Sequence, residues 1–271
     1  MVKRGVSALA MVVVLVAPPS AELKYSSHTQ MRSGTSGAQL SAMAGGMMGQ
    51  LYPVKGVDET VYVGDRGMRV EARQARLGMP AGAVLVTRAD GSKFGIDPAA
   101  KTFWKVAPAA PDVMASLGAK TDVTLNKTGQ FETIDGMRAE KVVITVSMPL
   151  PGIDPARLPP GFPAALTATM TAWLTDAIKG PRNVPAEELG VLDRFAAGAL
   201  TELAKDGRFA LKSVTEAFGL VVETTRSDFS TVDVPASMFE VPDGFKEIAA
   251  PQARIGGSAG ARGLTSPAPS R

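Results

Sequence analysis

The sequence predicts a mainly β protein in which an antiparallel sheet packs against one amphipathic helix. Three observations lead to this prediction. Apolar and polar residues alternate in many short segments, turn signals recur roughly every ten residues in the first half of the chain, and one stretch has helical spacing. The 271 residues are enough for two domains, but a single domain over residues 22–250 accounts for all of these segments.

The first 21 residues have the pattern of a secretory signal peptide. A basic start at residues 3–4 precedes an apolar run over residues 8–17, which is too short to span a bilayer. The small residues before Glu22 suggest cleavage after Ala21. We therefore expect a periplasmic or secreted protein without a stable membrane span. An uncleaved amphitropic anchor is the alternative, because Pro19 is unusual three positions before a cleaved bond.

Composition limits the partners of the chain. The formal net charge is +3, but it becomes −2 without five cations of the leader and the tail, namely Lys3, Arg4, Arg254, Arg262 and Arg271. The predicted domain has no basic stripe interleaved with aromatic residues, so we expect no nucleic-acid partner. The chain contains no cysteine, so neither a disulfide nor a thiol-linked lipid anchor is available.

The mature chain opens with a predicted strand and a predicted loop. Residues 22–31 alternate in the manner of a strand, whereas residues 32–53 are rich in glycine and methionine, which favours a loop. Methionines of this loop suggest two alternatives, a mobile apolar flap over a ligand or a thioether site for a soft metal. Since no cysteine accompanies them, we predict a plain loop and no metal.

A meander of short strands follows. The predicted strands cover residues 60–64, 67–75, 83–87, 93–96 and 102–106. The turns contain Asp90-Gly91 and Asp97-Pro98. We interpret both aspartates as turn formers rather than as an acid and base pair, because Asp-Gly and Asp-Pro favour turns by their backbone chemistry. Residues 111–117 have the pattern of a short helix.

The hairpin over residues 119–148 is the element around which we organise the fold. Val142, Ile144 and Val146 fall on one side of an extended chain, and residues 143, 145 and 147 fall on the other, as in a strand with one buried face. Asp135-Gly136 supplies the turn. A proline-rich excursion follows, and residues 167–176 then resume the alternation.

The face of that next strand that we expect to point inward carries Ala168, Met170, Ala172 and Leu174. Residues 185–205 carry apolar residues at helical spacing, with acidic residues in the first turn and Gly207 after the last. This helix is either ordinary core or a lid over an apolar cavity. Strands over residues 209–214 and 220–232, a turn over 235–239 and a disordered tail over 251–271 complete the prediction.

The order of these segments resembles a known family. The likeness is carried by TVYVGDRGMRVE, KFGIDPAAKTFWKV, KTGQFETIDGMRAEKVVITV, TAWLTD, FALKSVTEAFGLVVETT and VPASMFEVPDGFKEI. These segments are similar to the bacterial periplasmic domain-of-unknown-function family 4412, although many relatives have cysteine where this chain has Ala139. The resemblance implies a curved half-barrel similar to the LolA/LolB-like lipoprotein carriers, with helices in or over its mouth. It implies no catalytic residues, because the family has no established activity.

Catalytic chemistry finds little support in the sequence. Nucleophilic triads and most zinc sites need histidine or cysteine, and the chain has only His28, which we expect to be solvated on the polar side of its strand. No pair among the 26 acidic residues stands out by spacing. We therefore predict a protein that is not an enzyme and needs no cofactor.

The expected function is binding of an apolar ligand, such as a lipid, an acyl chain or a lipidated protein, in the concave face of the sheet. The candidate ligand-binding residues are Met170, Leu174, Leu189, Leu192, Phe195 and Leu200. The alternative is an envelope interaction or scaffold module with a self-filled core and no small ligand.

Export is directly testable. If residues 1–21 form a cleaved signal, the exported protein begins at Glu22 or within a few residues of it, which N-terminal sequencing or intact mass spectrometry will reveal. Recovery of full-length protein with Met1 from the cytoplasm would contradict the predicted compartment.

Overall fold

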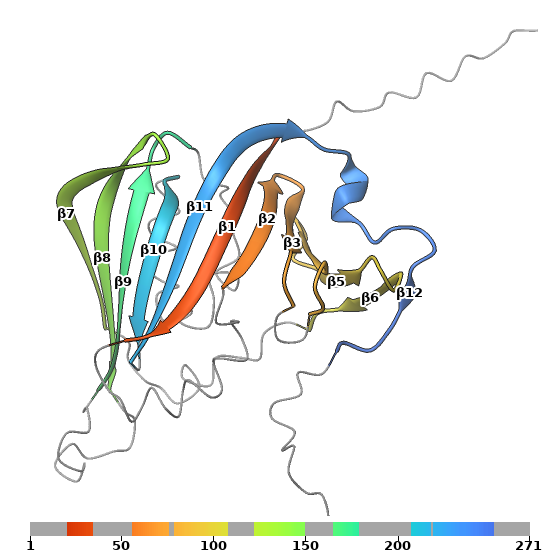
Figure 1. The fold of residues 1–271 in the computed structure, drawn as a ribbon, viewed down its shortest axis with the longest axis horizontal. Coiled ribbons are helices and arrows are strands. Elements are labelled where there is room, and N and C mark those ends of the chain that lie inside the picture. The colour runs from red at the N-terminus through yellow and green to blue at the C-terminus, as the bar shows by residue number, and fades with distance from the viewer. Residues whose placement is uncertain are drawn as a thin grey trace, which may run out of the picture.

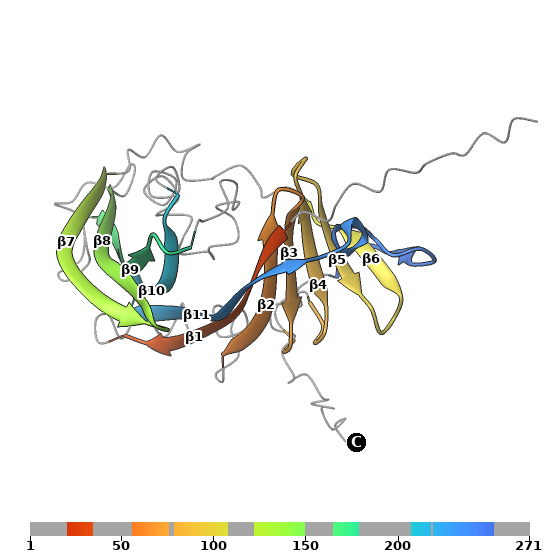
Figure 2. The ribbon, with the colours of Figure 1, turned by 90° about the horizontal axis from the view of Figure 1, so that it is seen from above.

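The chain forms one large, open sheet that is antiparallel except at one edge (Figures 1 and 2). The structure is a computed structural model that describes residues 21–34, 56–75, 79–107, 122–149, 165–178, 207–217 and 219–251. Twelve strands lie in the order β12-β6-β5-β4-β3-β2-β1-β11-β10-β9-β8-β7. Within the described residues β7 and β12 are therefore the two edges, and the sheet is not closed into a barrel.

The strands follow the alternating segments of the sequence. Their bounds are β1 Ala21–Ser33, β2 Val57–Gly64, β3 Gly67–Ala72, β4 Val84–Arg88, β5 Lys93–Asp97, β6 Thr102–Lys105, β7 Asp122–Ile134, β8 Met137–Pro149, β9 Ala165–Thr175, β10 Phe209–Ala217, β11 Leu220–Asp233 and β12 Lys246–Glu247. A 3-10 turn, η3, covers Ala236–Phe239. The hairpin predicted over residues 119–148 is confirmed as β7 and β8, with Asp135 and Gly136 at positive φ in its turn.

The ladder between β1 and β11 lies in the middle of the sheet and joins its two parts. Strands β2 to β6 extend from β1, and strands β10 to β7 extend from β11. At this junction the rings of Tyr25, Phe209 and Phe229 meet with centroids 5.4–5.7 Å apart. They belong to an apolar cluster that also contains Val61 of β2 and Leu211 of β10. The centre of the sheet is thus held by aromatic packing as well as by backbone hydrogen bonds.

Bulges let the sheet bend. The pairing of β1 with β11 shifts between Lys24 and Ser26, and Asp228 on the opposite strand has a φ of 57°. The pairing of β10 with β9 shifts at Leu211, between Ala210 and Lys212. Extra residues of this kind increase the local twist and curvature of a sheet. Figure 2 shows the result, since strands β7 to β10 curve to one side while β2 to β6 continue in the other direction.

The closing segment after β11 covers the other part of the sheet (Figure 1). Val234 and Phe239 are buried in one cluster with Val84, Val86 and Ile96. Its backbone carbonyl groups accept hydrogen bonds from three arginines, in the pairs Arg66 to Val234 at 3.3 Å, Arg69 to Met238 at 2.8 Å and Arg88 to Phe239 at 3.2 Å. An irregular segment therefore covers an apolar face here, because side chains satisfy its polar backbone.

The predicted combination of a sheet with an amphipathic helix is wrong for this structure. None of the described residues is α-helical, and the predicted helices over residues 111–117 and 185–205 lie outside them. The helix prediction rests on the spacing of apolar residues over 185–205. Where the structure describes a cover for the sheet, at Val234 and Phe239 of the closing segment, that cover is not α-helical. The fold is consequently an all-β, curved and open sheet over the described ranges.

The strand faces make a second prediction. Ile144 of β8 has an exposed fraction of 0%, whereas its neighbour Thr145 on the opposite face is partly exposed. Ile144→Asp buries a carboxylate in an apolar cluster, so we expect it to lower the free energy of unfolding by at least about 3 kcal/mol. Thr145→Asp should cost about 1 kcal/mol or less. Urea melts measure both, and equal losses would mean that both faces of β8 are equally sensitive.

Candidate functional site

The candidate ligand site is one side of the β7–β9 part of the sheet, which we name the apolar face. Alternation puts every second side chain of each strand on it, and the registers align these side chains across the strands. The apolar face consists of Val123, Leu125, Val142, Ile144, Val146, Ala168, Met170, Ala172 and Leu174. Six of these residues, those of β8 and β9 except Ala168, pack as one buried cluster.

Exposure changes systematically across the apolar face. In the registered row Leu125, Ile144 and Met170, the exposed fractions are 37%, 0% and 3%. The parallel row begins with Val123, which is 43% exposed, and continues to Val146 at 2%. Apolar surface that is solvent-accessible on the edge strand therefore continues without interruption into the buried interior of the sheet.

An ion pair borders the apolar face at one end. Glu140 is the registered partner of Leu174, and its Oε2 atom lies 2.6 Å from Nη1 of Arg208. Both side chains are largely buried, with exposed fractions of 18% and 10%. Charge-assisted bonds between partly desolvated groups are strong, so the pair forms a fixed polar boundary for the apolar row.

The structure brings together two of the six predicted site residues. Met170 and Leu174 lie on β9 within the apolar face and are 3% and 4% exposed. Leu189, Leu192, Phe195 and Leu200 lie outside the described residues. Val123 and Leu125 are not among the predicted ligand-binding residues. The signal that points to them is the alternation of apolar and polar residues over 122–126.

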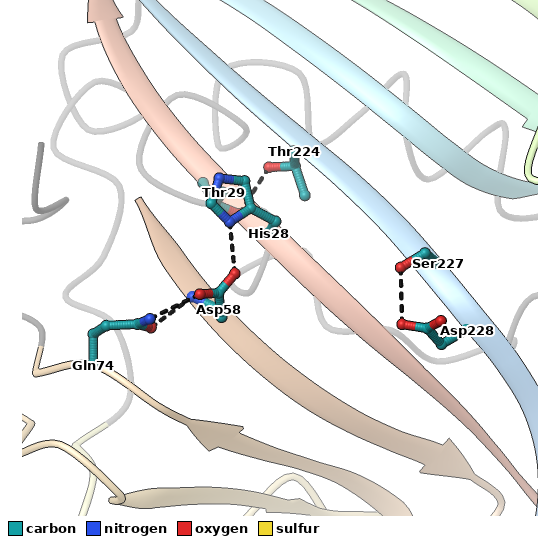
Figure 3. Close-up of polar contacts among 7 residues, drawn as sticks. All are labelled: His28, Thr29, Asp58, Gln74, Thr224, Ser227 and Asp228. Carbon is teal, nitrogen blue, oxygen red and sulfur yellow. Dashed lines mark hydrogen bonds and ion pairs between the residues drawn. The ribbon is translucent and has the colours of Figure 1, made fainter. Parts of the chain in front are cut away.

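A polar cluster on β1 and β2 is the second candidate site (Figure 3). His28 is the registered partner of Asp58, and its Nδ1–H group donates to Oδ1 of Asp58 at 2.6 Å. Gln74 donates from Nε2 to Oδ2 of Asp58 at 2.8 Å and accepts from the Asp58 backbone N–H at 2.7 Å. Gly56, at a φ of 81°, leaves space for the imidazole because a Cβ there would collide with it.

The electrostatics of this cluster follow from these bonds. The hydrogen bond from His28 lowers the pKa of Asp58, and the bond from Gln74 acts in the same direction. The side chains of His28 and Asp58 have exposed fractions of 39% and 44%, so His28 is partly solvated, and its ring also has a specific partner. Each bond ties the start of β2 to a neighbouring segment, which favours a structural role.

Neither candidate site has the composition of a metal centre. The described ranges contain no group of three or more histidine, aspartate or glutamate side chains that would hold an ion. The methionines 43, 47 and 48 of the predicted loop lie outside those ranges. Asp90 and Asp97 are confirmed as turn formers, since Asp90 accepts from Ser92 and Asp97 accepts from the backbone after it.

Comparisons with known proteins identify no family for this chain. No protein-family profile and no curated protein matches this chain. Among solved structures, an uncharacterized conserved protein from Thermus thermophilus matches with a TM-score of 0.41 and 11% sequence identity, over 85% of this chain and 91% of that one. The resemblance stated from the sequence therefore stays a prediction. In the part of the chain that the structure describes, no helix has the length and apolar character needed to cross a membrane.

The Asp58 carboxyl group gives a prediction with a defined sign. Because its pKa lies below the ordinary value of 3.8, its ionised form contributes stability above that value and loses it as the pH falls through the lower folded-state pKa. His28→Ala should raise the pKa of Asp58, as measured by NMR titration of the carboxyl carbon. Asp90 is the internal control, since its pKa is lowered by Ser92 and should not move. An unchanged Asp58 pKa would contradict the assigned bond.

Proposed function

We propose that this chain is an exported, non-enzymatic protein that binds an apolar ligand against the apolar face of its curved sheet. A lipid, an acyl chain or a lipidated polypeptide has the required chemistry. The single observation that supports this function most is the apolar row from Leu125 through Ile144 to Met170, which runs from an exposed edge to the interior. Contact with such a row stabilises an apolar ligand by about 25 cal/mol for each Å² removed from water.

The shape of the row supports an adaptable ligand. Ala168 and Ala172 flank Met170 on β9, so small side chains alternate with one flexible side chain. Methionine adjusts to irregular apolar partners better than branched residues do. The polar end at Glu140 and Arg208 suits a ligand that has one apolar and one polar end. Export is supported by the signal-like residues 1–21.

The second candidate is an interaction or scaffold module without a small ligand. It is favoured by one specific observation, which is that Val142 and Ile144 have no exposed surface and Met170 has almost none. A face that is already buried within the chain is a core rather than a site unless it opens. The two functions therefore differ in whether the apolar face takes up a probe.

A binding titration separates the two functions. The wild type should take up a fluorescent fatty-acid probe saturably, and Leu125→Ser should weaken its affinity by about threefold to tenfold because apolar contact is lost at the exposed end of the row. Thr124→Ser is the matched control, because Thr124 lies on the opposite face of the same strand. The affinity of this variant for the probe should equal that of the wild type. Native mass spectrometry of exported protein should show a co-purifying lipid. If no probe binds saturably, the scaffold function replaces the carrier function.

A further inference from the structure

The outer edge of β7 has the properties of an interface. Within the described ranges, large apolar side chains are exposed at four positions, and three of them, Val123, Leu125 and Phe131, lie on this one strand. Residues 122–127 are all exposed, and β7 pairs with β8 as its neighbour in the described sheet. An exposed edge strand with apolar side chains is a template for pairing with another chain.

The usable part of this edge is short. The pairing of β7 with β8 shifts between Lys127 and Phe131, and Gly129 has a φ of 68° in the interrupted stretch. The Thr128 hydroxyl group donates to the Lys141 carbonyl oxygen at 2.7 Å, which fixes the irregular backbone. Such bulges protect an edge from pairing because they turn its backbone away. Residues 122–127 form the longer regular stretch of this edge, and residues 131–134 form a second, shorter one.

We propose that residues 122–126 of β7 pair with the same residues of a second copy of this chain, in an antiparallel arrangement with Thr124 on the two-fold axis. Val123 then lies opposite the partner's Leu125, and Leu125 lies opposite the partner's Val123. Paired residues of an antiparallel ladder share a face, so both contacts extend the apolar face across the axis. The two exposed aliphatic side chains are buried against each other twice.

The polar face of the same segment is also self-complementary. Asp122 lies opposite the partner's Asn126, whose amide group donates to the carboxylate, and the two Thr124 hydroxyl groups meet on the axis. A two-fold axis at Leu125 would instead place Lys127 opposite the partner's Val123. An axis at Lys127 would place the two ammonium groups opposite each other, which is destabilising. Among these registers, the axis at Thr124 is the one that opposes apolar to apolar and polar to polar residues.

The contact is small, so the dimer is weak and depends on protein concentration. Interfaces that bury less than about 1,200 Å² in total belong to transient complexes. Strand pairing lies in the plane of the sheet, whereas the apolar face points out of it. Dimerisation through β7 therefore does not rest on the proposed ligand binding, and each of the two is measured separately.

Cysteine cross-linking tests the axis directly, because the natural chain has no cysteine. Antiparallel partners on the axis have Cα atoms about 4.5–5.5 Å apart, within the range of roughly 4.4–6.8 Å that a disulfide spans. Under mild oxidation, Thr124→Cys should form a covalent dimer several times faster than Asn126→Cys. The two Asn126 residues lie on the same face but are about 13 Å apart in this register. Equal rates for the two variants, or no dimer with Thr124→Cys, would overturn the proposal.

Charge substitutions test the register in the full chain by sedimentation velocity. The double variant Val123→Lys with Leu125→Lys places like charges opposite each other twice and should be monomeric at every concentration. Val123→Lys with Leu125→Glu places Lys opposite Glu twice and should keep the concentration-dependent dimer. Ile248→Lys, at the other end of the sheet, should behave as the wild type. A monomeric wild type, or two double variants that behave alike while circular dichroism shows both folded, would reject this interface.

Discussion

The ladder between β1 and β11 is the interaction on which the rest of the fold depends. It joins residues near the start of the described chain to residues some two hundred positions later, with twelve registered pairs from Ala21 with Asp233 to Ser33 with Leu220. Every other antiparallel ladder joins strands that are neighbours in the sequence among those described. Closing so long a loop costs more conformational entropy than closing a local hairpin does. The chain has no cysteine, so no disulfide lowers this cost. The Tyr25, Phe209 and Phe229 rings lie where that cost must be offset.

Two consequences of the central ladder shape the molecule. The strands on either side of it bury apolar side chains in separate clusters, one with the closing segment and one on β8 and β9. The bulges at Leu211 and Asp228 lie next to the ladder, so the sheet bends where its two parts join. The closing segment needs the three arginine donors because its carbonyl groups have left the sheet ladder. Curvature and cover thus both arise where regular pairing is interrupted.

The sequence predicted the strands well and their partners poorly. Alternation is a local property, so β1, the meander and the β7–β8 hairpin followed from residue patterns. The two-residue β12 was missed because it pairs in parallel with β6, far away in the sequence. The His28 and Asp58 contact requires a register between β1 and β2, and the predicted second strand begins at Thr60, beyond Asp58. The helix prediction used spacing over residues 185–205, and spacing alone does not show what covers a sheet.

Exposure on β7 is the feature that alternation could not reveal, because Val123 and Ile144 have the same pattern but opposite environments. Their difference arises from position in the sheet, since β8 has neighbours on both sides and β7 is an edge. An edge residue presents its side chain to one face and its backbone to the sheet plane. A ligand on the apolar face would contact the side chain of Leu125, whereas a partner strand at the edge would pair with the backbone and also pack against that side chain. The bulge after Lys127 confines both uses to the same short segment, so changes there must be assigned by separate measurements of face and edge.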